Sequence, residues 1–455
     1  MLSWELKCPH CGGPNEVGAD RNCLTCHFCG AGLWVQLPDG YPTLVAKRRV
    51  KRREAVYAWD RHLKEGGEPL SGSPRQQNCV YLPFWRISAI IALPRLERRV
   101  RPTAEAPYSE SEYNPLAHFA NDPTDTNEQV EWEIKPWDMS IPAFDSDEWG
   151  LATLGIRVET VPLTGWERVE LELDDVCYPV SVSESTAQGR IRKTVDSIIQ
   201  QGTHKPLGEC HLITPKLSLI YWPVWRVAEQ RGENGRITEI DGVSGKVIRT
   251  LTGRREFQDV EGKAVAGDAP ALMPHRCLSC GEDLPVTDRF VVFLCHNCHT
   301  LISHASNGKR QVITAEFAAA ENPLKQHWYP FWSFQGDDLL IPAFAIRNYR
   351  SLVRFSEIMS GQTRAFGDPP EGVHRLKGIV GAALPVDVAA GLARVVLERN
   401  MWQGIRAQMD RGRNPVAETN LGSPRLVYTA LQESGRELID PVTGLCLSRS
   451  ALASV

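Results

Sequence analysis

The chain has 455 residues, of which 42% are hydrophobic and 23% are charged, and its formal net charge is −4. This composition is typical of a globular protein and excludes an intrinsically disordered one. The near balance of charges gives no overall field that would hold the protein on DNA or on an anionic membrane, so such binding would need a local basic patch. The length predicts several domains.

No segment of the sequence is predicted to cross a membrane. The most apolar stretch, residues 378–397, contains Pro385, Asp387 and Arg394, whereas a spanning helix needs about 20 nearly uncharged residues. Residues 1–7 lack the charged-then-apolar order of a signal peptide. Eight of the thirteen cysteines form Cys-x-x-Cys pairs, which indicates metal ligands in a reducing compartment. The sequence therefore predicts a soluble, cytoplasmic protein.

Two Cys-x-x-Cys pairs near the start of the chain recur, with the same spacing, in its second half. Fourteen residues separate the two pairs in each case. Each pair can direct two thiolates at one ion, and the second pair completes a tetrahedron of four sulfurs, which suits zinc. The sequence thus predicts two zinc ions, one in each of two zinc ribbons. The predicted ligands are Cys8, Cys11, Cys26 and Cys29 for the first ion, and Cys277, Cys280, Cys295 and Cys298 for the second.

Iron is the alternative metal. Cys23, Cys26 and Cys29 are evenly spaced, as in some iron–sulfur proteins. The position that matches Cys23 in the second half is Val292, so Cys23 is interpreted as a strand residue. A rubredoxin-like iron site also uses two such pairs, although further apart. Because four sulfurs leave no open position for water, a zinc ion in either site would be structural. The histidines inside the turns, His10, His27, His296 and His299, are expected to be exposed or to lie beside the ligands, and not to bind the metal themselves.

A basic run follows the first ribbon, with six cations in seven residues, and continues as a helical pattern to Leu63. Three interpretations remain open: a solvated helix face, a contact to nucleic-acid phosphates, and a contact to an acidic protein or membrane. The candidate contact residues are Lys47, Arg48, Arg49, Lys51, Arg52 and Arg53.

Three short runs contain much of the aromatic content: Tyr81–Trp85, Tyr221–Trp225 and Trp328–Trp332. Each run contains a proline, which cannot donate a hydrogen bond to a neighbouring strand, so each is predicted to be an edge strand or a strand start. The favoured interpretation places these aromatic side chains in the core of a small sheet. The alternative is a stacking surface for bases or a groove for a peptide.

These marks, together with repeats of Ile-Pro-Ala-Phe and Ile-Asp-x-Val-x-Gly, occur in the same order twice. We therefore predict an internally duplicated α+β chain. Each half would be a zinc ribbon with four cysteine ligands, followed by a small antiparallel β-sheet domain with one amphipathic helix. The predicted domains are ribbon 1 (1–45), an α+β domain (46–255) with a loop insert (101–128), ribbon 2 (272–310) and a second α+β domain (311–455).

Catalytic motifs are absent from the sequence: there is no Walker loop, no dinucleotide-binding glycine fingerprint, no His-Glu-x-x-His and no Gly-x-Ser-x-Gly. Two adjacent carboxylate pairs, Asp174-Asp175 and Asp337-Asp338, would point to opposite faces of a strand and would not act together. The sequence predicts a protein that is not an enzyme.

The motifs resemble those of bacterial proteins with transcription-factor-IIB-type zinc ribbons. In that group a Cys-Pro-x-Cys-Gly ribbon precedes a Tyr-x-Pro-x-Trp strand and an Asp-Gly-x-Thr-Gly hairpin. The matching segments here are Cys8–Cys29, Tyr81–Trp85, Tyr221–Trp225 and Asp241–Gly245. Such proteins are often labelled as related to the primosomal helicase, but without a Walker motif no helicase activity follows. The resemblance implies bacterial origin and zinc.

Two hypotheses for the function follow. The first is a non-enzymatic zinc-binding adaptor or scaffold, whose partners are other proteins of a larger bacterial assembly. The alternative is a nucleic-acid-binding zinc-ribbon protein that uses the basic run 47–53 and exposed aromatic side chains. A third, weaker option is an enzyme with its site between the halves.

Overall fold

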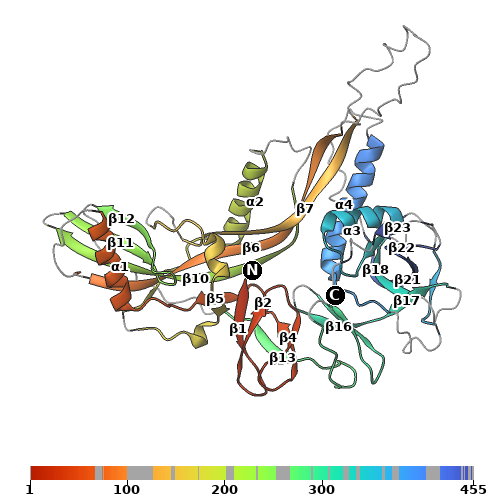
Figure 1. Ribbon diagram of the computed structural model, residues 1–455, viewed down its shortest axis with the longest axis horizontal. Coiled ribbons are helices and arrows are strands. Elements are labelled where there is room, and N and C mark those ends of the chain that lie inside the picture. Colours follow the sequence, from red (N-terminus) through yellow and green to blue (C-terminus); the bar gives the residue numbers. More distant parts are fainter. Residues whose placement is uncertain are drawn as a thin grey trace, which may run out of the picture.

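The protein is a mixed α+β fold made mostly of strands (Figure 1). Among the described residues, no helix has both the length and the apolar character needed to cross a bilayer. The computed structural model describes residues 2–66, 74, 76–99, 127–144, 149–172, 174–200, 210–231, 234–252, 267–287, 290–305, 308–320, 327–334, 339–360, 364–370, 379–405, 421–441, 444, 446–448 and 452.

A ten-stranded sheet forms the first half, with the strand order β12-β11-β10-β5-β8-β1-β2. Off this path, β6 pairs with β10, β7 and β9, and the long strands β6, β7 and β10 form the extended arm in Figure 1. The strands are β1 (Ser3–Lys7), β2 (Pro14–Gly18), β5 (Thr43–Ala46), β6 (Gln76–Arg99), β7 (Asn127–Pro142), β8 (Leu163–Thr164), β9 (Val176–Cys177), β10 (His211–Arg231), β11 (Asn234–Asp241) and β12 (Val247–Thr252).

This sheet differs from the small antiparallel sheet that the sequence predicted. It has ten strands, and the pairs β5–β10, β6–β9 and β1–β8 are parallel. The arm is long because β6 spans 24 residues and pairs with β7 along 16 of them. The predicted loop insert 101–128 lies outside the described residues, apart from its last two residues, which begin β7.

The second half contains a seven-stranded sheet with the order β19-β18-β21-β17-β20, to which β22 and β23 are added through β21. Its strands are β17 (Ala315–Ala318), β18 (His327–Phe334), β19 (Leu339–Pro342), β20 (Phe366–Gly367), β21 (Arg425–Ser434), β22 (Glu437–Ile439) and β23 (Cys446–Ser448).

Two three-stranded sheets, β13-β4-β3 and β14-β15-β16, carry three of the four cysteine pairs in or beside their turns, and the pair Cys8/Cys11 lies between β1 and β2 of the ten-stranded sheet. Strand β13 belongs to the second half by sequence, yet it pairs antiparallel with β4 of the first half, with Leu272 opposite Val35. The strands are β3 (Cys23–Thr25), β4 (Gly32–Gln36), β13 (Ala271–Pro274), β14 (Val292–Leu294), β15 (Leu301–His304) and β16 (Arg310–Ile313).

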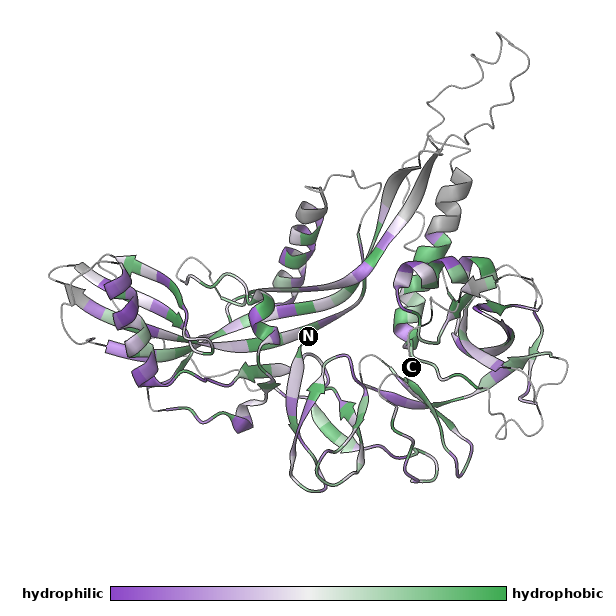
Figure 2. Ribbon diagram, viewed as in Figure 1, coloured by the Kyte–Doolittle hydropathy of each residue, from purple (hydrophilic) through white to green (hydrophobic). Residues whose placement is uncertain are grey.

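The described residues form two α-helices in each half, so the prediction of one per half is wrong. They are α1 (Arg52–Glu65), α2 (Glu184–Gln200), α3 (Tyr349–Met359) and α4 (Val386–Ile405). The α2 helix is amphipathic as predicted, with Ala187, Ile191 and Val195 in one buried stripe. In contrast, α4 is buried nearly all round: Arg394 is the one exposed side chain over residues 386–398. Figure 2 shows the difference between apolar α4 and hydrophilic α1.

The internal duplication is visible in individual hydrogen bonds. At each landmark, the second half repeats the bond that the first half makes between the equivalent atoms, so both halves share one backbone plan. In the first half these bonds run from Tyr178 N to Tyr81 O, from Ala143 N to Pro83 O, from Trp85 Nε1 to Val182 O and from Gly245 N to Asp241 O. Their equivalents in the second half, in the same order, run from Val380 N to Trp328 O, from Ala343 N to Pro330 O, from Trp332 Nε1 to Leu384 O and from Gly444 N to Asp440 O.

The three aromatic–proline runs lie in the core, which confirms the favoured interpretation. Tyr81, Trp85, Tyr221, Trp225 and Trp332 are all at most 3% exposed. The predicted edge position is wrong, because β6, β10 and β18 each have strands on both sides. The third run does lie at a strand start, the other predicted position, because β18 begins at His327.

Interior strands tolerate these prolines because each one lies where a neighbouring strand ends. The carbonyl of Pro83 accepts a hydrogen bond from Ala143 N, just beyond the end of β7, and that of Pro223 accepts one from Gly242 N, just beyond β11. The backbone N and O of a strand residue point to the same side of the strand. The proline nitrogen, which has no hydrogen to donate, therefore points to the side where the neighbouring strand has already ended, and no strand hydrogen bond is lost.

One hydrophobic core joins the two halves. Ile90, Trp132 and Ile213 of the first-half arm belong to the same buried cluster as Val388 and Leu392 of α4. Apolar burial of this kind is the main favourable contribution to folding, so the halves are packed together as parts of one body.

Candidate metal centres

The first four predicted ligands converge at the end of β1 and the turn between β3 and β4. The Sγ atoms of Cys8 and Cys29 are 3.7 Å apart, and those of Cys11 and Cys26 are 3.8 Å apart. All four Sγ atoms lie within 4.8 Å of one another. A tight turn shapes the first pair: Gly12 N donates to Cys8 O, and Gly12 has a φ of 73°, which a glycine adopts at little cost.

The second four ligands form the same arrangement. The Sγ atoms of Cys277 and Cys298 are 3.5 Å apart, and those of Cys280 and Cys295 are 3.6 Å apart. The four again lie within 4.8 Å of one another. Where the first centre has Gly30 after its last cysteine, the second has His299 at a φ of 58°. The turn therefore imposes a left-handed conformation even on a non-glycine residue.

These distances fit four thiolates around one metal ion. Zinc–sulfur bonds of about 2.3 Å in a regular tetrahedron place neighbouring sulfurs about 3.8 Å apart. Nearby donors also point at the sulfurs: Asn15 Nδ2 lies 3.6 Å from the Sγ of Cys26, and the backbone N of Ser279 lies 3.4 Å from that of Cys277. The two groups of four cysteines can hold two zinc ions, and other thiophilic metals fit the same sulfurs.

Hydrogen bonds favour the thiolate form of Cys26 in the first centre and of Cys277 and Cys298 in the second. Burial opposes ionisation of Cys26, but the backbone N–H groups of Cys29 and Phe28 and the Asn15 amide lower its pKa to about 6. In the second centre, the hydroxyl and backbone N–H of Thr300 lower the pKa of Cys298 to about 6. A metal ion binds thiolates rather than thiols, so these donors prepare the sulfurs for a cation.

Each centre faces the protein on one side and solvent on the other. Cys8, Cys26, Cys277 and Cys295 are buried, whereas their four partners are exposed. The four histidines in the turns are exposed, as expected, and none belongs to a ligand cluster. The protein groups alone complete both coordination spheres, which is the arrangement of a structural metal.

The hydrophobic cluster at the second centre contains Cys277 and Cys295, and it also includes Cys23 of β3 and Trp34 of β4, the strands beside the first centre. The Cys23 thiol lies in β3, outside the ligand set, and donates to Thr287 O of the other unit at 3.1 Å. The interpretation of Cys23 as a strand residue is confirmed. Its hydrogen bond adds a polar contact between the two centres.

Sequence reasoning missed three polar residues between the centres. His275 and His304 are buried side by side, with ring centroids 5.3 Å apart, and Arg310 lies over the Trp34 ring at 5.0 Å. Burial lowers the pKa of His304 to about 3, and the charge of Arg310 adds to this. Burial also lowers the pKa of Arg310, which the negative charge of Cys277 opposes. Their placement depends on contacts between distant segments, which no local motif signals.

The basic run is divided between ion pairs and solvent. Lys47 pairs with Glu5 at 2.7 Å, Arg48 with Asp175 at 2.6 Å, and Arg52 with Asp174 at 2.6 Å. The adjacent carboxylates Asp174 and Asp175 therefore bind two arginines. The side chains of Arg49, Lys51 and Arg53 are exposed.

The chain matched no family model, no curated protein and no solved structure. The geometry of the two metal centres is therefore the basis for inferring their function.

Proposed function

We propose that this protein is a non-enzymatic zinc-binding adaptor of a larger bacterial assembly, in which two structural zinc ions hold its two halves in a defined arrangement. The observation that carries this proposal is the pairing of β13 with β4: a strand from the second half completes the sheet beside the first metal centre. The hydrophobic cluster that joins the second centre to β3 and β4 supports the same conclusion.

The closed ligand sets support a role without catalysis. A catalytic zinc keeps one position for water or substrate, and its protein ligands usually include histidine or a carboxylate. Here four sulfurs complete each set, and the nearest histidines of the turns lie outside it. Zinc bound in this way contributes folding free energy directly.

Metal is needed because the strands around the centres are short. Strands β3 and β14 have three residues each, and β13 and β15 have four. So few ladder hydrogen bonds hold a sheet only weakly in isolation. An ion that ties both ends of each unit together supplies the missing constraint.

Nucleic-acid binding has less support from the geometry. The three aromatic–proline runs are buried and cannot stack on bases, and three of the six cations are paired with carboxylates. Arg49, Lys51 and Arg53 are exposed and form no ion pair with another described residue. This alternative predicts binding that weakens steeply with salt.

The test is affinity capture by the intact tagged protein from a bacterial lysate, with and without nuclease, together with metal analysis of the purified protein. We expect two zinc ions per chain and stoichiometric protein partners that survive nuclease. The Cys8→Ser and Cys277→Ser variants should each lose a zinc ion and capture less partner, whereas Cys446→Ser, at an exposed cysteine outside both centres, should behave like wild type. Partners that disappear with nuclease would favour nucleic-acid binding, and metal-free protein that retains its fold and partners would refute the proposal.

A further inference from the structure

The two large sheets end differently at equivalent strands. In the first half β5 pairs with β8, and β1 then adds to β8 as a parallel strand, with Trp4 opposite Leu163. In the second half β17 pairs with β20 in the same way, but among the described residues β20 has no second strand partner. The position that β1 occupies in the first half is therefore an open edge in the second.

The strand registers define which residues correspond. Val45 lies opposite Tyr221 and Phe317 lies opposite Tyr428, so these two positions are equivalent. Continuing from them, the register pairs Ala46 with Leu163 in the first half and Ala318 with Phe366 in the second. The equivalences used below are Leu163 with Phe366, Thr164 with Gly367, and Lys47 with Ala319.

Burial differs sharply at these positions. Leu163 and Thr164 are both 0% exposed beneath the added strand. Phe366 is only half-buried and Gly367 is exposed. A Cβ atom built on Gly367 would meet nothing within 4 Å. The second-half edge thus has space beside it that β1 fills in the first half.

The strand that could have covered this edge is used elsewhere. β1 lies immediately before Cys8, and β13 precedes Cys277 at the matching place in the sequence. However, β13 pairs with β4 of the first half. Its use at the metal centres leaves the β20 edge without its own covering strand.

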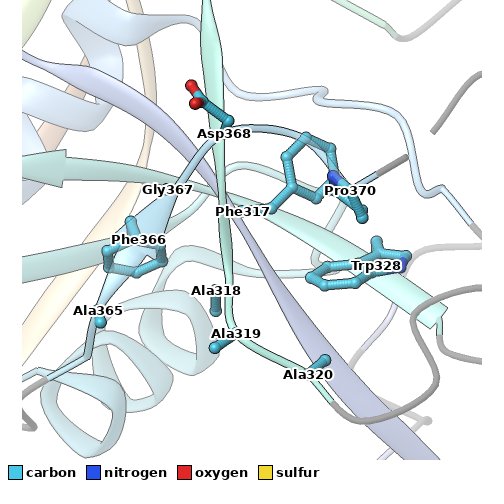
Figure 3. A pocket seen from close by; sticks show the side chains of 10 residues that line it. All are labelled: Phe317, Ala318, Ala319, Ala320, Trp328, Ala365, Phe366, Gly367, Asp368 and Pro370. Carbon is cyan, nitrogen blue, oxygen red and sulfur yellow. The ribbon is translucent and has the colours of Figure 1, made fainter. Parts of the chain in front are cut away.

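A cavity of about 430 Å³ opens at this edge (Figure 3). Its walls are mainly apolar, formed by Phe317, Trp328, Phe366 and Pro370 together with three consecutive alanines. Asp368 is the one charged residue among them, so the cavity favours an apolar group next to a positive charge.

In the first half, protein side chains fill the corresponding corner. Glu5 of β1 pairs there with Lys47, which is equivalent to Ala319, and also with Arg168. Trp166 lies beside it, with its ring 5.0 Å from that of Tyr221. Thus the occupied corner of one half shows what the empty corner of the other can accommodate.

We infer that the β20 edge and its cavity bind an extended segment of a partner protein, which adds to the sheet as a parallel strand. The first half supplies the chemistry of this segment: in β1, Trp4 and Leu6 are buried while Lys7 is exposed. The partner segment accordingly has an aromatic residue and, two positions later, an aliphatic residue, which pack on the face of the sheet that Trp4 and Leu6 cover in the first half. The residue between them takes the place of Glu5 and points into the cavity, and it is apolar because Ala319 stands where Lys47 pairs with Glu5. A basic residue follows near Asp368. Main-chain hydrogen bonds supply affinity and the cavity supplies specificity. This inference rests on the adaptor function, for which it names one partner surface.

The direct test uses the intact protein and a fluorescent synthetic peptide, Leu-Ser-Trp-Leu-Leu-Lys, which is the sequence of residues 2–7 with leucine in place of Glu5. We expect saturable binding by fluorescence anisotropy, and about tenfold weaker binding when this leucine is changed back to glutamate, because the cavity has no cation in the place of Lys47. Gly367→Arg, which places a charge on the open edge, and Ala319→Trp, which fills the cavity, should each weaken binding by a similar factor. Val312→Arg, at an exposed apolar residue of β16, is the matched control and should bind like wild type.

Circular dichroism checks that the variants remain folded. Absence of peptide binding, or equal binding by wild type and both edge variants, would overturn the inference. The capture experiment separates it from the proposed function. If the wild-type protein captures no partner, the adaptor function fails. If the wild type captures partners and Gly367→Arg captures the same ones in the same amounts, only the edge site fails.

Discussion

The same indole hydrogen bond anchors each half. Trp85 Nε1 donates to Val182 O at 2.7 Å, and Trp332 Nε1 donates to Leu384 O at 2.8 Å, both in buried surroundings. Trp85→Phe and Trp332→Phe should each lower the free energy of unfolding by about 1–3 kcal/mol, because a buried carbonyl loses its donor. Urea denaturation measures this loss.

Trp132 provides the control for these variants, because it is 2% exposed and its Nε1 has no hydrogen-bond partner among the described residues. Trp132→Phe should lower the free energy of unfolding clearly less than Trp85→Phe or Trp332→Phe does. Equal losses at all three positions would mean that ring volume, not the hydrogen bond, is what matters.

His304 makes stability depend on pH. Its pKa is lowered to about 3 in the folded protein and is about 6.5 in an unfolded chain. As pH falls from about 6.5 towards 3, the unfolded state gains a proton that the folded state does not, so stability decreases. The cost at pH 5 is about 2 kcal/mol. The charged and titratable neighbours, Arg310 and His275, remain in a His304→Phe variant.

His304→Phe should therefore lose less stability than wild type between pH 7.5 and pH 5. Parallel urea denaturation of both proteins at the two pH values measures the difference, and any acid release of metal affects both proteins alike. If wild type and His304→Phe lose the same free energy of unfolding between pH 7.5 and pH 5, His304 is already protonated in the folded protein at pH 5.

The ligand cysteines could be predicted from the sequence because spacing alone determines which thiolates can reach one ion. His304 and Arg310 could not, because their environment consists of Trp34 and Phe293, which come from separate segments. The basic run shows the same limit. Its charges are visible in the sequence, but the carboxylates that pair with Arg48 and Arg52 lie more than a hundred positions away.

At the scale of elements, α4 packs against β10 of the other half with no spare volume. A Cβ atom on Gly391 would lie 2.3 Å from Cγ2 of Ile213. Gly391→Ala should lower the free energy of unfolding by about 1–3 kcal/mol through overpacking, although alanine favours a helix by about 1 kcal/mol over glycine. Thermal or urea denaturation measures the result.

Gly189 of α2 is the matched helical control, because a Cβ atom there meets nothing within 4 Å. Gly189→Ala should raise stability by about 0.5–1 kcal/mol. If both substitutions stabilise the protein, α4 does not pack against β10 as closely as described.

Among the elements, α2 could be predicted from its apolar spacing, whereas α3 was missed. Its start is marked by Asn348, whose side chain accepts a hydrogen bond from Ser351 N, a capping pattern that is readable in the sequence. The interior position of the proline-containing strands could not be predicted, because it depends on where β7 and β11 end.

For the whole molecule, the hydrophobic cluster at the second centre predicts that the two metal centres are coupled, because it includes Cys23 and Trp34 of β3 and β4, the strands beside the first centre. Cys277→Ser removes a ligand of the second centre and loosens the cluster that contains Trp34 and Cys23. The first centre should then release its metal faster to a chromogenic chelator than it does in wild type. Cys446→Ser should leave the rate unchanged, and an unaltered rate in Cys277→Ser would show that the centres are independent.

The duplication could be predicted from ordered repeats, and it is confirmed bond by bond. The pairing of β13 with a strand of the first half could not be predicted in this way. The residues before Cys277 suggest a strand in the same place as β1, and only the register of Leu272 with Val35 shows that this strand serves the other half. Sequence similarity within a chain predicts equivalent elements but not their neighbours.

The pairing of β13 with β4 also has a consequence for how the protein is made. Ala271 lies opposite Gln36, so the sheet beside the first metal centre stays incomplete while the ribosome synthesises nearly all of the first half. At about 5–20 residues per second, the nascent chain spends many seconds with exposed thiolates at its N-terminal end. During that interval, a chaperone or a metal donor could act on the first centre before the rest of the chain closes over it.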